Sequence, residues 1–334
     1  MKNKLQIIAE IAQGFEGNFE QSKLLIKAAA KAGADAVKFQ LVYADELATK
    51  DYQYYALFQG LEMEVEKWRA LNEYAHHLGI KFIVDVFGEQ SLNTAQEIGL
   101  NTIKIHGTDV TNIGLLEAVA ASSIETVILG IGGSFWSEIA TALSLLEKKR
   151  LVLLCGFQAY PTTTEDNHIA RMNVIAAKAR TMHQNFLMGF ADHPGEDQYV
   201  NTISLVALGA GAGCIEKHLT LGKVMELEDY ESALNPDEFA TFVDQLRTGE
   251  KALGLGIDTD DFNMSKAEKQ YRANVRRDVV ANEDIEINTI LSSKNIQLKR
   301  TNNDKALKTI SGVLGKKLLR SIEKDKAFEK EMLS

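Results

Sequence analysis

The feature that most limits the possible folds of this chain is a regular alternation of short apolar runs with longer segments of helical period. The apolar runs predict strands over residues 5–11, 36–40, 80–87, 102–105, 126–129, 151–155, 187–190 and 214–217. Apolar residues at helical spacing predict helices over residues 19–32, 65–78, 89–98, 115–121, 136–146, 167–181, 199–208 and 237–253. Eight strand–helix units in roughly 250 residues predict a (β/α)8 TIM barrel. An open doubly wound sheet is the alternative, but no GxGxxG motif follows the first predicted strand.

The pattern changes after Gly256. Residues 257–274 are polar and acidic, which is typical of a linker. Beyond them, short β-type runs predict a small separate module over residues 275–334, with strands at 278–281, 289–291 and 296–298. The barrel is therefore expected over residues 1–256.

Composition excludes several classes of protein. A formal net charge of −9 over 334 residues argues against non-specific nucleic-acid binding. Cys155 and Cys214 lie far apart with no CxxC spacing, which argues against a disulfide framework and fits a reducing cytosol. No signal-peptide core follows Met1, and no apolar run is long enough to span a bilayer. We therefore expect a cytoplasmic protein that binds neither nucleic acid nor membrane.

Two lysines interrupt predicted strands that should be apolar on both faces. Lys38 and Lys104 each lie between two large apolar residues. A buried ammonium group needs either an anionic ligand or a carboxylate of the protein. Because function in a TIM barrel gathers at the carboxyl ends of the strands, we favour a ligand. A structural ion pair with Glu10 or Glu216 is the alternative.

Histidines stand at the ends of the last two predicted strands, as Asp192-His193 and Glu216-Lys217-His218. Neighbouring parallel strands deliver both imidazoles to one rim, which predicts a divalent-metal pair at His193 and His218. The alternative is that each histidine is an ordinary polar residue at a strand end.

More polar side chains are expected at the same rim, namely those of Gln40, Asp85, His106, Gln158, Tyr160 and Asp192. With a metal and two lysines, this set suits a metal-assisted carbon–carbon bond reaction on a small anionic substrate. The metal would polarise a carbonyl, and a carboxylate would move a proton or hold sugar hydroxyls. The glycine run at 130–133 could cradle a phosphate through backbone N–H groups, although glycines also simply make tight turns.

At these positions the chain resembles the sialic acid synthase family, which also makes related nonulosonic acids. The matching stretches are residues 8–11 (IAEI), 34–40 (ADAVKFQ), 103–105 (IKI), 160–162 (YPT), 192–193 (DH) and 215–218 (IEKH). The module at 275–334 resembles that family's antifreeze-like (SAF-type) domain, and the matching residues are Arg276-Arg277, Lys299-Arg300 and 314–317 (LGKK). The resemblance covers almost the whole chain in the expected order.

The resemblance implies a transferase that condenses phosphoenolpyruvate with an N-acetylmannosamine-like amino sugar to give a sialic (nonulosonic) acid. It implies a divalent metal on His193 and His218, Mn²⁺ or alternatively Mg²⁺. The implied catalytic residues are Glu10, Lys38, Lys104 and Glu216. The implied substrate contacts are Gln40, Asp85, Gln158, Tyr160, Asp192, Asp229 and Arg300. Family members are domain-swapped homodimers, so Arg300 would reach the partner subunit's site.

The chain departs from the family pattern on the donor side. Hydroxyl residues that the family carries are replaced at Gly107, at Ala191 and in the glycine run at 130–133. Each lost hydrogen bond to a charged donor group costs about 1.5–3 kcal/mol. Asp85 adds a negative charge that repels an anionic donor unless a cation intervenes. We therefore expect a remodelled donor pocket.

Two other functions remain open from the sequence. One is a metal-dependent lyase or isomerase that acts on a sugar and does not use phosphoenolpyruvate. The other is a catalytically silent relative that binds a sugar acid.

Overall fold

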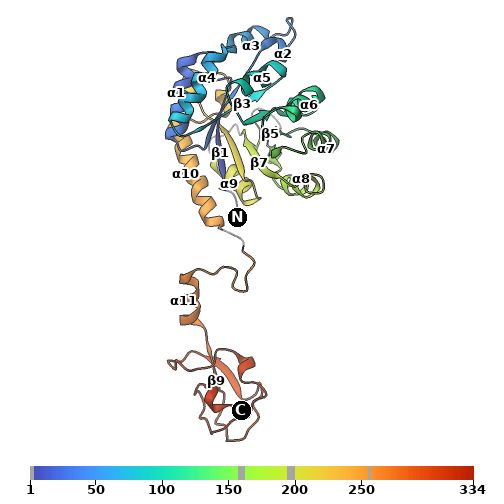
Figure 1. Cartoon of the computed structure of the whole chain (residues 1–334). Coiled ribbons are helices and arrows are strands. Elements are labelled where there is room, and N and C mark those ends of the chain that lie inside the picture. The colour runs from blue at the N-terminus through green and yellow to red at the C-terminus, as the bar shows by residue number, and fades with distance from the viewer. Residues whose placement is uncertain (1–3, 157–161, 194–199, 255–256) are drawn as a thin grey trace. The chain divides into compact units, whose positions relative to one another are not determined.

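A computed structural model describes residues 4–156, 162–193, 200–254 and 257–334 (Figure 1). The chain folds as two compact units, Met1–Gly254 and Leu255–Ser334. In the described part of the chain, no helix is both long enough and apolar enough to cross a membrane.

Eight parallel strands close into a barrel in the first unit (Figure 1). They are β1 (Gln6–Ala12), β2 (Ala36–Gln40), β3 (Lys81–Val86), β4 (Thr102–Ile105), β5 (Thr126–Gly130), β6 (Arg150–Cys155), β7 (Phe186–Asp192) and β8 (Cys214–His218). Each strand pairs with its neighbours in sequence, and β1 pairs with β8 to close the barrel, with Glu10 opposite His218. The predicted TIM barrel is confirmed.

The helices of this unit alternate with the strands and lie outside the barrel (Figure 1). They are α1 (Phe19–Lys31), α4 (Val65–His77), α5 (Glu89–Glu97), α6 (Ile113–Ala121), α7 (Trp136–Leu145), α8 (Arg171–Ala179), α9 (Val200–Gly209) and α10 (Pro236–Leu253). Helix α1 shows why they form. The Asn18 side chain caps its first turn by accepting from the backbone N–H groups of Glu20 and Gln21, and Leu25 and Ile26 are buried on its inner face.

Side chains along each strand alternate between two layers. Those that point outward join the main core between the strands and the helices. Those that point inward form a separate apolar cluster of Ile8, Ala36, Ile83, Ile128, Val152, Leu154, Ala191 and Cys214. Residues two positions further along a strand face the same way, so Glu10, Lys38, Asp85 and Glu216 also point into the barrel, at its carboxyl end.

Two short helices were not predicted. Helices α2 (Ala44–Leu47) and α3 (Tyr55–Leu61) lie between β2 and α4, where the sequence indicates only a long loop. Each buries one residue, Ala44 and Leu61 respectively, so neither carries a recognisable apolar period.

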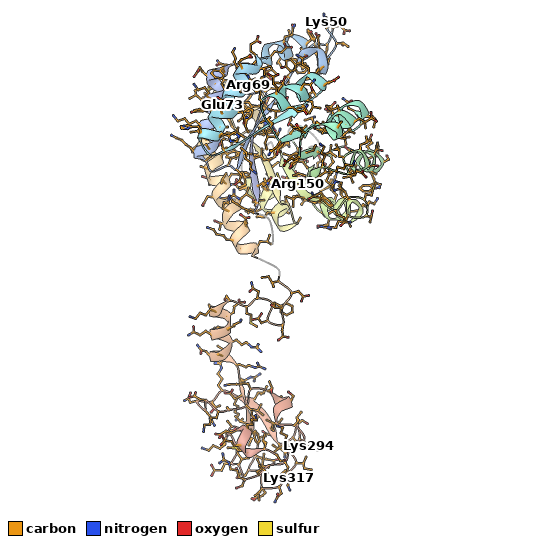
Figure 2. The ribbon with its side chains drawn as sticks, viewed as in Figure 1. Lys50, Arg69, Glu73, Arg150, Lys294 and Lys317 are labelled. Carbon is orange, nitrogen blue, oxygen red and sulfur yellow. The ribbon has the colours of Figure 1, made fainter. Side chains whose placement is uncertain are left out.

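The second unit contains α11 (Lys266–Val275) and the antiparallel strands β9 (Asp278–Ala281) and β10 (Ile296–Lys299). Its own core includes Val279, Val313 and Phe328. Lys294 and Lys317, which are labelled in Figure 2, are exposed on this unit. The unit therefore has a buried centre of its own, and both of these lysines lie on its surface.

Two expectations for this part of the chain differ from the structure. The segment predicted as a linker holds most of α11, because Ser265 and Glu268 cap its first turn reciprocally. The strand predicted at 289–291 is wrong. Only Ile290 of this run pairs, in an isolated bridge with Lys317, and it is 68% exposed, whereas Leu291 packs into the core of the unit without forming a ladder.

Candidate active site

A cavity of about 270 Å³ opens at the carboxyl ends of the barrel strands. Nine of the residues expected at this site line it, namely Glu10, Gln40, Asp85, Lys104, His106, His193, Glu216, His218 and Asp229. The Lys38 side chain has no exposed surface and contacts the same carboxylates. Side chains from five strands and three loops therefore converge where TIM barrels hold their active sites.

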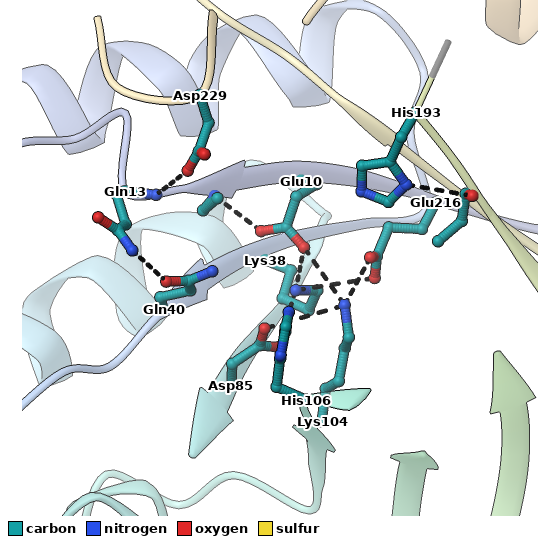
Figure 3. A network of polar contacts seen from close by, with 12 residues as sticks. Glu10, Gln13, Lys38, Gln40, Asp85, Lys104, His106, His193, Glu216 and Asp229 are labelled. Carbon is teal, nitrogen blue, oxygen red and sulfur yellow. Dashed lines mark hydrogen bonds and ion pairs between the residues drawn. The ribbon is translucent and has the colours of Figure 1, made fainter. Parts of the chain in front are cut away.

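Two lysines and three carboxylates form a charged cluster in this cavity (Figure 3). Lys38 Nζ lies 2.7 Å from Asp85 Oδ1 and 3.7 Å from Glu216 Oε2, and it also contacts Glu10. Lys104 Nζ lies 2.6 Å from Glu216 Oε1, 3.8 Å from Glu10 Oε2 and 3.9 Å from Asp85 Oδ2. Both lysines thus have the carboxylate partners that the ion-pair alternative required, and Lys104 also faces the cavity where a ligand was expected.

Burial and mutual attraction set the protonation of the charged cluster. Burial raises the pKa of Glu10 to about 8, against the opposing attraction of Lys38. Burial also favours the neutral form of Glu216, but Lys104 and Lys38 outweigh it and lower its pKa to about 2. For Lys38, burial opposes the charge, yet Asp85 and Glu10 raise its pKa well above the usual range. Near neutral pH, Lys38 is therefore charged, Glu216 is ionised and Glu10 carries a proton.

The two predicted metal-binding imidazoles are neighbours. The ring centroids of His193 and His218 are 5.1 Å apart, and both rings are buried. Burial lowers the pKa of His193 to about 3 and that of His218 well below its usual range, so both rings are neutral. His193 Nδ1 lies 3.2 Å from the carbonyl oxygen of Ala191, which only accepts, so Nδ1 carries the hydrogen. Within the described ranges, no group of three or more His, Cys, Asp and Glu side chains could hold a metal ion.

A second polar wall of the cavity lies beside the charged cluster (Figure 3). Asp229, in the segment after β8, accepts a hydrogen bond of 3.2 Å from the backbone N–H of Gln13, and Gln13 Nε2 donates to Gln40 Oε1 at 2.9 Å. Burial raises the pKa of Asp229 to about 6. Gln13 was not among the predicted site residues, although its position just beyond β1 was a usable signal. Apolar Leu47 and Phe58 also line the cavity and were missed, because they belong to the unpredicted helices α2 and α3.

Besides Lys38, four predicted site residues are not among those that line the cavity. The Asp192 carboxylate lies 3.5 Å from Lys217 Nζ and accepts a hydrogen bond from the Ser204 hydroxyl of α9, so it points outward from β7. Gln158 and Tyr160 lie outside the described residues. Arg300 belongs to the second unit, where its Nε donates to the carbonyl oxygen of Val275 at 3.2 Å.

The glycine run after β5 has a packing role. A Cβ atom on Gly130 would lie 2.7 Å from the backbone nitrogen of Gly107, so the ends of β4 and β5 approach too closely for a side chain there. This close approach accounts for Gly130 without a phosphate.

Two family models match the chain. The NeuB family model matches residues 25–258, and the SAF domain model matches residues 276–334. The first match alone covers more than half of the chain, and the second covers the unit that contains β9 and β10.

Individual proteins agree with the family models. An uncharacterized protein of Methanocaldococcus jannaschii is 33% identical over 96% of this chain and 91% of its own length. The N,N'-diacetyllegionaminic acid synthase of Legionella pneumophila is 29% identical over 93% of this chain and 90% of its own length. The crystal structure of N-acetylneuraminic acid (sialic acid) synthetase from Leptospira borgpetersenii aligns with a TM-score of 0.73 and 30% identity, over 82% of this chain and 93% of that one. With its barrel, its SAF domain and these full-length relatives, the chain belongs to the NeuB family.

Proposed function

We propose that this protein condenses phosphoenolpyruvate with an N-acetylmannosamine-like amino sugar to form a sialic (nonulosonic) acid. The enol carbon C3 attacks the aldehyde carbon of the sugar and forms the new carbon–carbon bond. Water adds at C2, and phosphate leaves. The observation that carries this proposal is one cavity lined by Lys104, three carboxylates and two neutral imidazoles, with Lys38 buried against the same carboxylates. The full-length similarity to an N,N'-diacetyllegionaminic acid synthase supports the class of product.

In this proposal, the charged cluster binds the donor and moves protons. Lys104 and Lys38 attract the carboxylate and phosphate of phosphoenolpyruvate. Glu10 holds a proton near neutral pH, because burial raises its pKa to about 8, and donates it as charge develops on the substrates. Glu216 keeps Lys104 in position through their 2.6 Å contact.

The sugar lies against the second polar wall in the same proposal. Gln40 and Asp229 accept or donate hydrogen bonds to its hydroxyls, and Gln13 holds both of them. We also assign Gln158 and Tyr160 to substrate binding, on the family resemblance alone. Asp192 takes a positioning role, because its carboxylate is bound to Ser204 and Lys217.

We assign a divalent metal, Mn²⁺ or alternatively Mg²⁺, to His193 and His218. Two neutral imidazoles whose ring centroids are 5.1 Å apart are nitrogen ligands that fit such an ion. The ion supplies polarisation of the sugar's aldehyde.

We propose further that the donor pocket is remodelled. Asp85 lies 2.7 Å from Lys38 and so takes up positive charge that would otherwise face the donor. Lys104 remains as the lysine that lines the cavity. The donor is therefore held more by Lys104 than by Lys38.

The decisive test is release of phosphate from phosphoenolpyruvate. Purified full-length protein with Mn²⁺ is incubated with a panel that contains N-acetylmannosamine and 2,4-diacetamido sugars, and inorganic phosphate is measured. We expect release only when an amino sugar is present, no release by Lys104→Met, and full release by Lys148→Gln, an exposed lysine that does not line the cavity. Absence of turnover across the whole panel, together with no thermal protection by phosphoenolpyruvate, would count for a lyase, an isomerase or a silent binding protein.

We also propose that the enzyme is a cytoplasmic homodimer in which Arg300 completes the partner subunit's site. Free, buried Cys155 and Cys214 support a reducing compartment. The test is complementation between two inactive variants, Arg300→Ala and Lys104→Met. If the sites are shared, mixing them restores about a quarter of the wild-type activity, because random reassortment gives half mixed dimers with one intact site each. No recovery after subunit exchange, shown by native mass spectrometry, would place Arg300 in its own subunit's site.

A further inference from the structure

A second cavity lies at the opposite, amino end of the barrel. It holds about 300 Å³, which is at the lower end of the range for small-molecule sites. Its apolar surface includes Ala36, Ile83, Ile128 and Val152, four members of the apolar cluster inside the barrel. Ala36 is small, and it leaves room beside these larger side chains.

The first residues of the strands add polar groups to this cavity. Thr102, Thr126 and Arg150 are successive partners across β4, β5 and β6, and Lys81 pairs with Ala36 across β3 and β2. All of them line the cavity. Lys81, Thr126 and Arg150 each stand two positions before an inward-facing member of the apolar cluster. Because side chains alternate along a strand, these three also point toward the barrel interior.

The charges at this end are unbalanced. In the described ranges, the side chains of Lys81 and Arg150 make no hydrogen bond and no ion pair. Of the two acids that line the cavity, Asp35 is already bound by Lys4 at 2.8 Å and by Arg247. Glu125 is the other acid, so two free cations face one free carboxylate.

We propose that this amino-end cavity, defined by Ala36, Lys81, Thr102, Thr126 and Arg150, binds a small organic anion. The guanidinium of Arg150 suits a carboxylate or a phosphate, because its fork of donors matches both in a bidentate way. Strands β3 and β6 are three positions apart in a closed barrel of eight, so Lys81 faces Arg150 across the mouth. The threonine hydroxyls donate to the same anionic group, and the apolar part of the ligand lies on Ile83, Ile128 and Val152.

This ligand site is separate from the catalytic cavity but shares its strands. Ala36 and Ile83 stand two residues before Lys38 and Asp85, which places the ligand beneath the charged cluster. Among the residues that the structure describes, none lines both the amino-end cavity and the catalytic one. Variants at the amino end therefore leave the groups that bind donor and sugar in place.

The test is calorimetric titration of the full-length protein with phenyl phosphate and, separately, with benzoate. Benzyl alcohol has the same ring without the charge and serves as the ligand control. We expect saturable binding of at least one anion and none of benzyl alcohol. The double variant Lys81→Gln/Arg150→Gln should weaken binding at least about tenfold, whereas Lys148→Gln, which removes an exposed charge two residues from Arg150, should change it less than about twofold.

The outcomes separate clearly. Preference for phenyl phosphate or for benzoate tells whether the natural ligand carries a phosphate or a carboxylate. Failure of wild-type protein to bind either probe at concentrations up to about 10 mM overturns the proposal. So does binding that persists in the double variant or is lost equally in Lys148→Gln. Equal unfolding temperatures of the three proteins show that the comparison is between folded chains.

Discussion

The two ends of the barrel carry similar residue types in opposite electrostatic states. At the carboxyl end, Lys38 and Lys104 are buried and each is held by carboxylates. At the amino end, Lys81 and Arg150 are exposed and make no ion pair in the described ranges. Buried charges must be paired because desolvation is costly, whereas exposed charges are stabilised by water. The difference teaches that burial, and not strand position, decides which cations of this barrel need a partner.

The largest expected effect comes from removing a paired cation at the carboxyl end of the barrel. Lys38→Met leaves Glu10, Asp85 and Glu216 with Lys104 alone. We expect the free energy of unfolding to fall by about 3–5 kcal/mol, as when one partner of a buried ion pair is lost, and phosphate release to cease. Urea unfolding followed by circular dichroism measures the loss. The double variant Lys38→Met/Asp85→Asn also removes the carboxylate that lost its partner, so it should recover part of the lost free energy of unfolding. A double variant no more stable than Lys38→Met would contradict the pairing of Lys38 with Asp85.

The second effect is a change in pH dependence at the sugar side. Burial raises the pKa of Asp229 to about 6, so this carboxyl group loses its charge below that pH. If the ionised form binds the sugar, kcat/KM falls about tenfold per pH unit below 6. Asp229→Asn should remove this acid limb and lower the rate at pH 8. If kcat/KM of Asp229→Asn still falls below pH 6, the titration of another group causes that fall.

The raised pKa of Asp229 also makes the stability of the protein depend on pH. The folded state holds the Asp229 proton more tightly than the unfolded chain does, since the pKa rises from 3.8 to about 6. Its contribution to stability is therefore fully present below pH 3.8 and is lost as the pH rises through 6. Relative to Asp229→Asn, wild-type protein should lose stability over this window, as denaturant titrations at several pH values would detect.

A smaller effect is expected from Asp85, which lies at the carboxyl end of the barrel where we place the donor. Asp85→Asn frees Lys38 from one of its two closest carboxylates and removes a negative charge near the donor. We expect KM for phosphoenolpyruvate to fall about threefold to tenfold, by about 0.7–1.4 kcal/mol, with a smaller change in kcat. Asn93→Asp, an exposed change of the opposite charge that lies outside the cavity, is the control. A rise in KM for Asp85→Asn would mean that the carboxylate itself assists donor binding.

The smallest effect is expected at the amino end of the barrel. Arg150→Met removes an exposed cation with no partner in the described ranges, and the free energy of unfolding should change by less than about 0.5 kcal/mol. This variant is the direct counterpart of Lys38→Met. A loss similar to that of Lys38→Met would show that Arg150 is paired in solution and would remove the contrast between the two ends.

Much of the architecture could be predicted from local pattern. The strands at 36–40 and 102–105 were predicted with their observed bounds, because β-type runs end at clear turns there. Helices α2 and α3 were missed because each buries a single residue. Leu47 and Phe58, two apolar residues of the cavity wall, were therefore missed as well.

The sequence by itself determined the eightfold alternation, the position of the lysines inside strands and the histidines at strand ends, because these are properties of consecutive residues. The tertiary structure alone decided which charges meet. Lys104 and Glu216 are 112 positions apart and lie 2.6 Å from one another only because the barrel closes. Asp192 points outward because Ala191 before it points inward, and the pairing of β7 with β8 places Lys217 beside it. Local pattern thus predicts the elements, whereas pairing in a low-dielectric interior depends on contacts that no local pattern contains.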